Sequence, residues 1–384
     1  MSYRIPFNRP CLAGSEYKYI AEAIAGGHAS GDGPFTRKCH EILEKELGAA
    51  KVLLTTSCTH ALEMAALLLE CGPDDEVIVP SFTFVSTANA FALRGSKLVF
   101  ADIRPDTLNL DDNRLESLIT SKTKAIVVVH YAGVSCEMDS ILAIASRHGI
   151  RVVEDNAHGL FSKYKGAYTG TMGCLATQSF HETKNFTCGE GGALVINDAA
   201  LEERALVIRE KGTNRSRFFR GEVDKYSWVD LGSSYLPSDL LAAFLYAQLE
   251  AKEQIQQKRR GVWNRYYESL AGWAESNDVR LPVIPPECEQ AHHMFYVLLP
   301  SIEHREWLIA HLKSQGMLSV FHYSPLHLSE AGKRFAARES HCPITEDISE
   351  RLLRLPFYND LGENEQDQVI AAVKNFRVRQ RSVA

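Results

Sequence analysis

The stretch KAIVVVHYAGVSCEMDSILAIASRHGIRVVEDNAHG, residues 124–159, contains two apolar runs with a helical pattern between them. KAIVVVH (124–130) and IRVVED (150–155) are continuous apolar runs, which are typical of strands buried on both faces. MDSILAIASRHG (138–149) is amphipathic, so the stretch predicts a strand, a helix and a parallel strand. The same alternation predicts an α/β fold with a parallel sheet covered on both faces, with further strands at 51–56, 75–80 and 97–102.

The second half of the chain predicts a smaller domain. The helical stretch 237–270 exceeds the usual length of a globular helix, and we interpret it as the connection between domains. We expect a large domain over 1–250 and a small C-terminal α+β domain over 251–384, and leave open where residues 1–25 pack. The small domain is expected to contain strands at 293–300 and 317–323 and helices at 305–316 and 364–376.

Size and charge exclude several classes of function. The 384 residues are 45% hydrophobic, so the chain can bury a large core. Its 42 basic and 48 acidic residues are well mixed, without a basic stripe for nucleic acid or anionic lipid. The start MSYRIPFNRP lacks the apolar core of a signal peptide, no apolar run is long enough to span a membrane, and the nine scattered cysteines predict reduced thiols without a zinc site. We therefore expect a cytoplasmic protein that binds small molecules or copies of itself.

Ligands of open parallel sheets bind beyond the carboxyl ends of the strands, so the residues there are candidates. Asp155 ends the run IRVVED, and His158 follows it. Acids in this position also cap loops and helices, so Asp155 alone does not decide the function. In TSCTHALEMAALLL, Cys58 and Thr59 open a helix whose N-terminus suits a phosphate, although an ordinary N-cap at Ser57 or Thr59 is the better explanation of this segment taken alone.

Two further residues point to the same edge of the sheet. Phe84, in PSFTFVSTANA, can lie against a flat heterocycle, although core packing explains most phenylalanines. Lys184 lies in SFHETKNFTCGEGG (179–192), a segment of small and polar residues typical of a ligand-lining loop. A desolvated lysine has a lowered pKa and acts as nucleophile and base, whereas an exposed loop lysine needs no such role.

The combination of these features indicates pyridoxal 5′-phosphate (PLP) as cofactor. A lysine forms the Schiff base, an acid keeps the pyridine nitrogen protonated, and a helix N-terminus holds the phosphate. An aromatic ring and these three parts follow one another in this chain at the ends of predicted strands.

The order and spacing of the motifs resemble the DegT/DnrJ/EryC1/StrS sugar aminotransferases, PLP-dependent enzymes of fold type I, the aspartate aminotransferase fold. The resemblance covers nearly the whole chain. It rests on GDGPFTRKCHEILEKELGAAKVLLTTSCTHALEMAALLL, DDEVIVPSFTFVSTANA, FADIRPDTLNLD, VVVHYAGVSCEMD, VVEDNAHG, SFHETKN, GEGG and HYSPLH.

The resemblance implies roles for individual residues. Lys184 is implied as the lysine that carries the cofactor, Asp155 as the partner of the pyridine nitrogen and Phe84 as the plate on the ring. His158 is implied near the ring hydroxyl, and Cys58, Thr59 and Ser179 at the phosphate. Many relatives have a G-y-N-y-R stretch whose Asn reaches the partner subunit's phosphate; here Ser234 stands in its place. Substrate contacts are implied for Gly31, Phe35, His181, His322 and His327, with an ordinary turn at 31–37 and structural roles for His322 and His327 as alternatives.

The implied reaction is a ping-pong transamination without a metal, in a homodimer whose active sites are shared between subunits. L-Glutamate is the implied donor, and Lys184 moves the proton. The segments 209–228 and 231–244 are most similar to members that aminate C4 of TDP-4-keto-6-deoxy-D-glucose, giving TDP-4-amino-4,6-dideoxy-D-galactose and 2-oxoglutarate. Alternatives are amination at C3, a UDP- or GDP-linked sugar, a PLP-dependent dehydratase, and a PLP-binding regulator without turnover. The dehydratase is disfavoured because members with that activity have lost the lysine to histidine.

Overall fold

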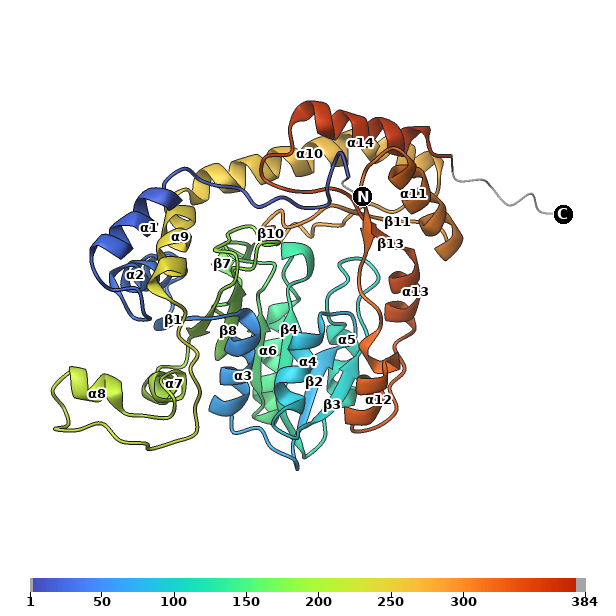
Figure 1. The fold of residues 1–384 in the computed structure, drawn as a ribbon. Coiled ribbons are helices and arrows are strands. Elements are labelled where there is room, and N and C mark those ends of the chain that lie inside the picture. The colour runs from blue at the N-terminus through green and yellow to red at the C-terminus, as the bar shows by residue number, and fades with distance from the viewer. Residues whose placement is uncertain (1–2, 378–384) are drawn as a thin grey trace.

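A seven-stranded sheet forms the centre of the protein in the computed structural model, which describes residues 3–377 (Figure 1). Its strands are, in spatial order, β1 (Lys51–Thr55), β9 (Gly192–Ile196), β8 (Leu175–Ser179), β5 (Arg151–Asp155), β4 (Thr123–Val129), β2 (Glu76–Pro80) and β3 (Lys97–Ala101). Neighbouring strands from β8 to β3 are parallel, whereas β9 runs antiparallel to both β1 and β8. The predicted α/β class and the five predicted strands are confirmed.

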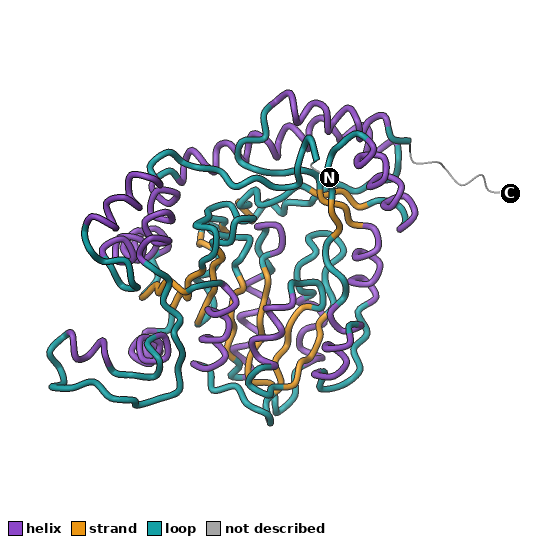
Figure 2. Tube along the Cα trace, in the orientation of Figure 1, coloured by secondary structure: helices purple, strands orange, loops and turns teal. Residues whose placement is uncertain are grey.

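Helices cover both faces of this sheet because successive residues of each strand point to opposite sides (Figure 2). Val153 packs in the core beneath α3 (Cys58–Leu68), α4 (Val85–Ala92) and α7 (Glu202–Arg209). Its neighbour Val152 packs on the other face, against α6 (Met138–His148). By the same alternation, Glu154 faces α6 and Asp155 faces α3 and α4.

The predicted single helix over 237–270 is wrong. The chain forms two helices, α9 (Asp239–Glu250) and α10 (Lys252–Ser276), with Ala251 between them. Ala251 has φ −91° and ψ 16°, outside the α-helical region, and so ends one helix and precedes the next, although its N–H still donates to the carbonyl of Ala247 (3.3 Å). The predicted boundary between residues 250 and 251 coincides with this break, and the division into two domains stays a prediction.

A second hydrophobic core lies between a small antiparallel sheet and three helices. The sheet has the order β11 (Tyr296–Leu298), β13 (Leu352–Arg354) and β12 (Val320–Phe321), and the helices are α10, α11 (Ile302–Ser314) and α14 (Glu363–Asn375). The predicted strand over 317–323 shortens to two residues, because Met317 forms a bridge with Ile5 instead. Ile5 is buried in this second core, so the start of the chain packs against residues from the second half of the sequence.

The remaining elements connect or cover these two cores. They are α1 (Glu16–Ala25), α2 (Pro34–Leu47), α5 (Asp112–Leu115), α8 (Arg215–Phe219), α12 (Glu330–Phe335), α13 (Pro343–Arg351), β6 (Lys163–Tyr164), β7 (Ala167–Tyr168) and β10 (Cys288–Glu289). Figure 1 shows α8 and its flanking loops projecting from the rest of the chain. Within residues 3–377, no helix combines the length and the apolarity that crossing a bilayer requires.

Candidate active site

A cavity of about 630 Å³ lies beyond the carboxyl ends of the parallel strands. Residues from both halves of the chain line it, including β13 and the segment before β11. The structure brings nine of the predicted site residues together here: Cys58, Thr59, Phe84, Asp155, His158, Ser179, His181, Lys184 and His322. The charged side chains in the lining are Asp155, Lys184, Glu190 and Arg354.

Asp155 is a buried carboxylate on one side of this cavity. Its Oδ2 accepts a hydrogen bond from Thr87 Oγ1 (2.7 Å) on α4, and its Oδ1 accepts one from the backbone N–H of Ala157 (3.2 Å). Burial raises the pKa of Asp155, and these two hydrogen bonds oppose the shift only in part. Since both donors are neutral, the carboxylate still lacks a cation in direct contact, and its position favours a positively charged ligand group.

Lys184 lines the same cavity as Asp155 and lies on the loop that joins β8 to β9. Its backbone N–H donates to the carbonyl of His181 (2.9 Å), which closes a tight turn and turns the side chain toward the cavity. Burial lowers the pKa of Lys184 to about 8, while the charge of Asp155 acts in the opposite direction. The amine is therefore much more available as a nucleophile at neutral pH than an ordinary lysine, whose pKa is about 10.4.

The N-terminus of α3 opens into the same cavity. Ser57 caps the helix, because its Oγ accepts from the N–H of His60 (3.1 Å). The N–H groups at the start of a helix lack intrahelical acceptors, so those of Cys58 and Thr59 are suited to an anion. Gly192 lies so close that a Cβ there would be 2.3 Å from the carbonyl carbon of Ser57. A residue with a Cβ at this position would clash with the backbone at the start of α3, so the close packing of β9 there requires glycine.

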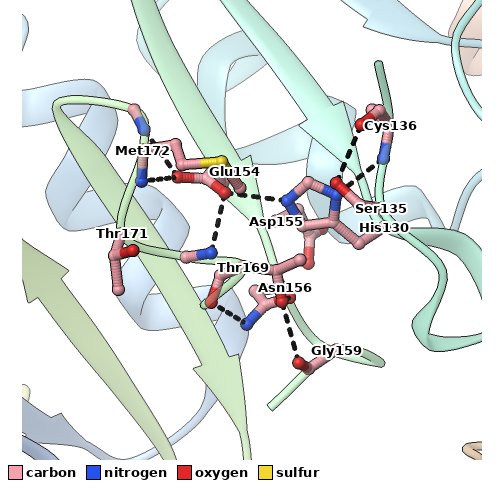
Figure 3. A network of polar contacts seen from close by, with 12 residues as sticks. His130, Ser135, Cys136, Glu154, Asp155, Asn156, Gly159, Thr169, Thr171 and Met172 are labelled. Atoms are coloured by element: carbon pink, nitrogen blue, oxygen red, sulfur yellow. Dashed lines mark hydrogen bonds and ion pairs between the residues drawn. The ribbon is translucent and has the colours of Figure 1, made fainter. Parts of the chain in front are cut away.

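A buried network behind Asp155 holds the ends of β4 and β5 together (Figure 3). Glu154 Oε2 accepts from His130 Nε2 (2.8 Å) and the N–H of Gly170 (2.7 Å). Glu154 Oε1 accepts from the N–H groups of Met172 (2.7 Å) and Gly173 (2.6 Å). Burial favours a raised pKa for Glu154, but the hydrogen bonds from His130 and the backbone outweigh it and the pKa is lowered. The network fixes the backbone that carries Asp155.

Replacing Glu154 with glutamine should destabilise the fold by about 2–4 kcal/mol at neutral pH, because the new NH₂ group would face two of the four donors. The lowered pKa stabilises the folded state above the unfolded value of about 4.3 and loses this effect as the pH falls through the folded value. The difference in unfolding free energy between the variant and the wild type should therefore become smaller at acidic pH. Urea midpoints at neutral and acidic pH measure it.

The exposed Glu268 of α10 provides the matched control, and Glu268→Gln should leave the urea midpoint unchanged. A Glu154→Gln protein with the wild-type midpoint at neutral pH would show that the network contributes nothing to stability.

Three imidazoles form a stack beside Lys184. The ring of His158 lies 4.3 Å from that of His293 and 6.1 Å from that of His322, with interplanar angles of 17° and 22°. Tyr131 Oη is 3.0 Å from His322 Nδ1. Burial lowers the pKa of each of the three histidines well below its usual value, so they are neutral at physiological pH.

His293 also reaches the Lys184 loop. Its Nδ1 is 2.8 Å from Asn185 Oδ1, and Asn185 Nδ2 donates to the carbonyl of Ala291 (2.7 Å). The residue next to Lys184 is thus bonded to the segment before β11, and the loop position depends on the second half of the chain.

Comparison with known proteins agrees with this geometry. Residues 10–374 match the profile of the DegT/DnrJ/EryC1/StrS aminotransferase family. The chain belongs to this family. It is 31% identical to SpsC, a spore coat polysaccharide biosynthesis protein of Bacillus subtilis, over 97% of this chain and 96% of that protein. The PLP form of Spr1654 from Streptococcus pneumoniae aligns with a TM-score of 0.89 and 28% identity, covering 97% of this chain and 98% of that one.

A second solved structure, the aminotransferase TlmJ from Streptoalloteichus hindustanus, aligns with a TM-score of 0.88 and 29% identity over 96% of this chain and 98% of that one. DegT/DnrJ/EryC1/StrS aminotransferases are PLP-dependent and have fold type I, and Spr1654 has been solved with both PLP and its amino form, PMP. The predicted family, fold and cofactor are confirmed.

The donor set of the cavity fits PLP. Asp155 supplies a buried carboxylate without a contacting cation, which suits a protonated ring nitrogen. The start of α3 supplies free N–H groups together with the hydroxyl of Thr59, whose Oγ1 is 2.8 Å from Ser86 Oγ. Lys184 supplies an amine with a lowered pKa.

Two predicted substrate contacts lie outside the cavity of their own chain. Phe35 is only 4% exposed and packs against Tyr19 and Tyr246. Gly31 faces Leu236, whose Cβ would be 2.6 Å from a Cβ at residue 31. The glycine and the aromatic ring thus serve the packing of α2 against α9, and within one chain the structure does not bring them to the cavity.

His327 and Ser234 also lie outside the lining. His327 Nδ1 is 2.6 Å from Ser81 Oγ, and its Nε2 is 3.2 Å from Glu346 Oε1. These contacts agree with the structural role that the sequence analysis kept as the alternative for His327. Ser234 is exposed and forms a bridge with Glu210 beside the projecting α8. Its contact with a partner subunit stays a prediction.

Several lining residues were missed from the sequence. They are Phe7 and Asn8 near the N-terminus, Thr87 on α4, His293 before β11, Tyr323 after β12 and Arg354 on β13. Thr87 lies one helical turn after Phe84, so its position could have been inferred. The others come from segments whose approach to the cavity depends on the packing of the second core, which no local pattern specifies.

Proposed function

We propose that the protein is a nucleotide-sugar aminotransferase that moves the amino group of L-glutamate to C4 of TDP-4-keto-6-deoxy-D-glucose. The products are TDP-4-amino-4,6-dideoxy-D-galactose and 2-oxoglutarate. The observation that carries the reaction class is the pairing of Lys184, whose pKa is about 8, with the buried Asp155 across one cavity. Membership of an aminotransferase family and the likeness to a polysaccharide biosynthesis protein support a sugar as acceptor.

Lys184 has two tasks in this proposal. Its Nζ is the amine that would hold the cofactor covalently, and the free amine would serve as the base that moves a proton at the substrate carbon. PLP supplies an electron sink for the substrate carbanion when it is bound. The lowered pKa of Lys184 suits both tasks, because the amine must give up and take up a proton near neutral pH.

The other cavity residues bind and orient the cofactor. Asp155 would keep the ring nitrogen protonated, and Phe84, which is 58% exposed at the cavity edge, would pack against the ring. Cys58, Thr59 and Ser179 would hold the phosphate at the start of α3, and His158 would contact the ring hydroxyl.

The proposed assembly is a homodimer with active sites shared between subunits. The segment around α8 exposes an unusual number of large apolar side chains, which suits contact with a second copy. These are Phe219, Tyr226, Trp228, Val229 and Leu231, with exposures of 52–76%. Ser234 lies directly after them and is proposed to reach the partner's phosphate site.

A panel of acceptors tests the substrate. Purified protein carrying the amino form of the cofactor is mixed with TDP-4-keto-6-deoxy-D-glucose, the corresponding 3-keto sugar, and UDP- and GDP-linked 4-keto sugars. The proposal expects the fastest turnover with the first, and an NMR spectrum of the product with an axial amine at C4. Faster amination of another acceptor, or of C3, would overturn the substrate assignment and leave the aminotransferase class intact.

The pKa of Lys184 predicts how cofactor capture depends on pH. With a pKa of about 8, roughly a tenth of the amine is free at pH 7, and the free fraction approaches one above the pKa. The rate of covalent PLP capture by the apoprotein should therefore rise with pH and level off above about pH 8. Borohydride reduction at timed intervals, followed by mass spectrometry, measures it. A rate that still climbs toward an ordinary lysine pKa of about 10.4 would show that Lys184 is not perturbed.

A further inference from the structure

Arg259, on α10, is a buried arginine outside the cavity lining that donates to three neutral acceptors. Its Nε donates to the carbonyl of His292 (2.9 Å), and its Nη2 donates to the carbonyl of His293. Its Nη1 donates to Asn359 Oδ1 (2.6 Å), and its Cζ lies 4.7 Å from the centre of the Phe357 ring. The planar guanidinium holds its donors in a fixed fork, so the two successive carbonyls are fixed relative to each other and to α10.

These two carbonyls belong to residues 291–293, here called the junction segment, which contains one strained residue. His292 has φ 50°, in the left-handed region that residues with a side chain rarely adopt. A residue keeps such a conformation only where its surroundings over-determine it. The bonds from Arg259 to the carbonyls of His292 and His293 supply that constraint. The shape of the junction segment therefore depends on Arg259.

The loops that follow three neighbouring strands of the large sheet meet at the junction segment. After β4, the carbonyl of Gly133 accepts from the N–H of Ala291 (3.0 Å). After β5, the ring of His158 stacks on that of His293 at 4.3 Å. After β8, Asn185 Nδ2 donates to the carbonyl of Ala291 (2.7 Å), and Asn185 Oδ1 is 2.8 Å from His293 Nδ1. One segment from the second half of the chain thus sets the relative positions of three loops at the carboxyl edge of the sheet.

Asn185 fastens the Lys184 loop to the junction segment with both ends of its amide. Because the NH₂ group is used by the carbonyl of Ala291, the amide oxygen faces His293, and Nδ1 of that ring must carry the proton. Burial keeps His293 neutral by lowering its pKa, so this donor is an uncharged imidazole. Asn185 is buried and directly follows Lys184, so the two bonds fix the backbone one residue from the amine.

We propose that Arg259 is a positioning residue for Lys184 and holds its amine in the cavity through the junction segment and Asn185. This assignment rests on the proposed function, because it takes Lys184 as the residue that binds the cofactor. The constraint comes from α10, which runs from α9 to the second core (Figure 1). The packing of the second core therefore acts on the reactivity of a lysine that the large sheet carries.

The test is the pH dependence of covalent PLP capture by apoprotein carrying Arg259→Gln, measured by borohydride reduction and mass spectrometry. Glutamine lacks the fork that holds both carbonyls, so the junction segment and the Lys184 loop should loosen. Water should then reach the amine, and the pKa of Lys184 should move from about 8 toward the ordinary value of about 10.4. We expect the midpoint of the profile to rise by about one pH unit, which corresponds to about tenfold slower capture at pH 7.

The titratable groups that interact with Lys184 are the same in the variant and the wild type. They are Cys58, Asp155 and Arg354, together with the neutral rings of His158, His293 and His322. A change in the capture midpoint therefore reports the position of the amine. A purely structural role of Arg259 would lower the urea midpoint of unfolding and leave the capture midpoint at the wild-type pH.

Further variants locate the effect. Asn185→Leu removes both bonds to the junction segment and should raise the capture midpoint as well. The double variant should shift the midpoint no further than the larger single shift, because both residues act along one route. Arg260 is exposed on the same helix and gives the matched control, so Arg260→Gln should retain the wild-type profile.

An unchanged capture midpoint in Arg259→Gln would overturn the assignment, and additive shifts in the double variant would show that Arg259 does not act through Asn185. If Arg259→Gln fails to fold by circular dichroism, Arg259→Lys decides, because lysine keeps the charge without the fork. A raised midpoint in that protein supports the assignment, and an unchanged midpoint contradicts it. Wild-type apoprotein that captures no PLP at Lys184 would instead refute the proposed function.

Discussion

Replacing Lys184 with alanine is expected to abolish transamination, lowering the rate by about 10⁴-fold, because the lysine supplies the proton-transferring base. The cofactor should still bind, since the contacts to its phosphate and ring come from other segments such as the start of α3. Turnover with L-glutamate and keto sugar, and the PLP retained after dialysis, measure the two effects separately.

Lys313→Ala is the matched control, because this lysine is exposed on α11. It should retain wild-type activity. A Lys184→Ala protein with near-normal turnover would refute the assignment of Lys184, whereas loss of both PLP and folded structure would show that the substitution acts on stability.

Asp155→Asn is expected to lower the rates of both half-reactions by about 10²- to 10³-fold, the usual effect of removing one preorganised electrostatic group. The amide keeps the size of the side chain and can keep the hydrogen bond from Thr87, but it cannot hold a proton on the ring nitrogen. A cationic ring nitrogen next to Asp155 would lower the raised pKa of this carboxyl, which means that the charged pair attracts. The amide of the variant lacks this attraction, so its affinity for PLP should fall as well. Single-turnover spectra and PLP titrations measure rate and affinity.

The exposed Asp139, which pairs with Lys165, is a suitable control because surface ion pairs contribute little. Asp139→Asn should match the wild type. If Asp155→Asn kept full activity in both half-reactions, the carboxylate would have no part in the chemistry.

The large sheet could be predicted from the sequence because its strands are buried on both faces and read as continuous apolar runs. The run that ends at Asp155 is such a case, and β5 pairs in register with β4 on one side and β8 on the other. The small sheet was less predictable. Its strand at Val320–Phe321 is short because Met317 pairs with Ile5, more than 300 residues away, a contact without a local signal.

The candidate site likewise contains residues that could be predicted from the sequence and residues that could not. Asp155, Lys184 and Cys58 follow strands or open a helix, so their place at one edge of the sheet follows from topology. Phe35 and His327 carry the right residue types, but their surroundings give them packing and hydrogen bonds elsewhere. Arg354 ends a three-residue strand in the second core, and its approach to the cavity depends on how that core packs.

The central claim is that this protein carries an amino group from an amino acid to a keto sugar on PLP, and one spectrum tests it most directly. The visible absorbance of purified, PLP-loaded protein is recorded before and after L-glutamate, and again after TDP-4-keto-6-deoxy-D-glucose. We predict that L-glutamate removes the visible band and that the keto sugar restores it. A band that L-glutamate leaves unchanged would contradict the account.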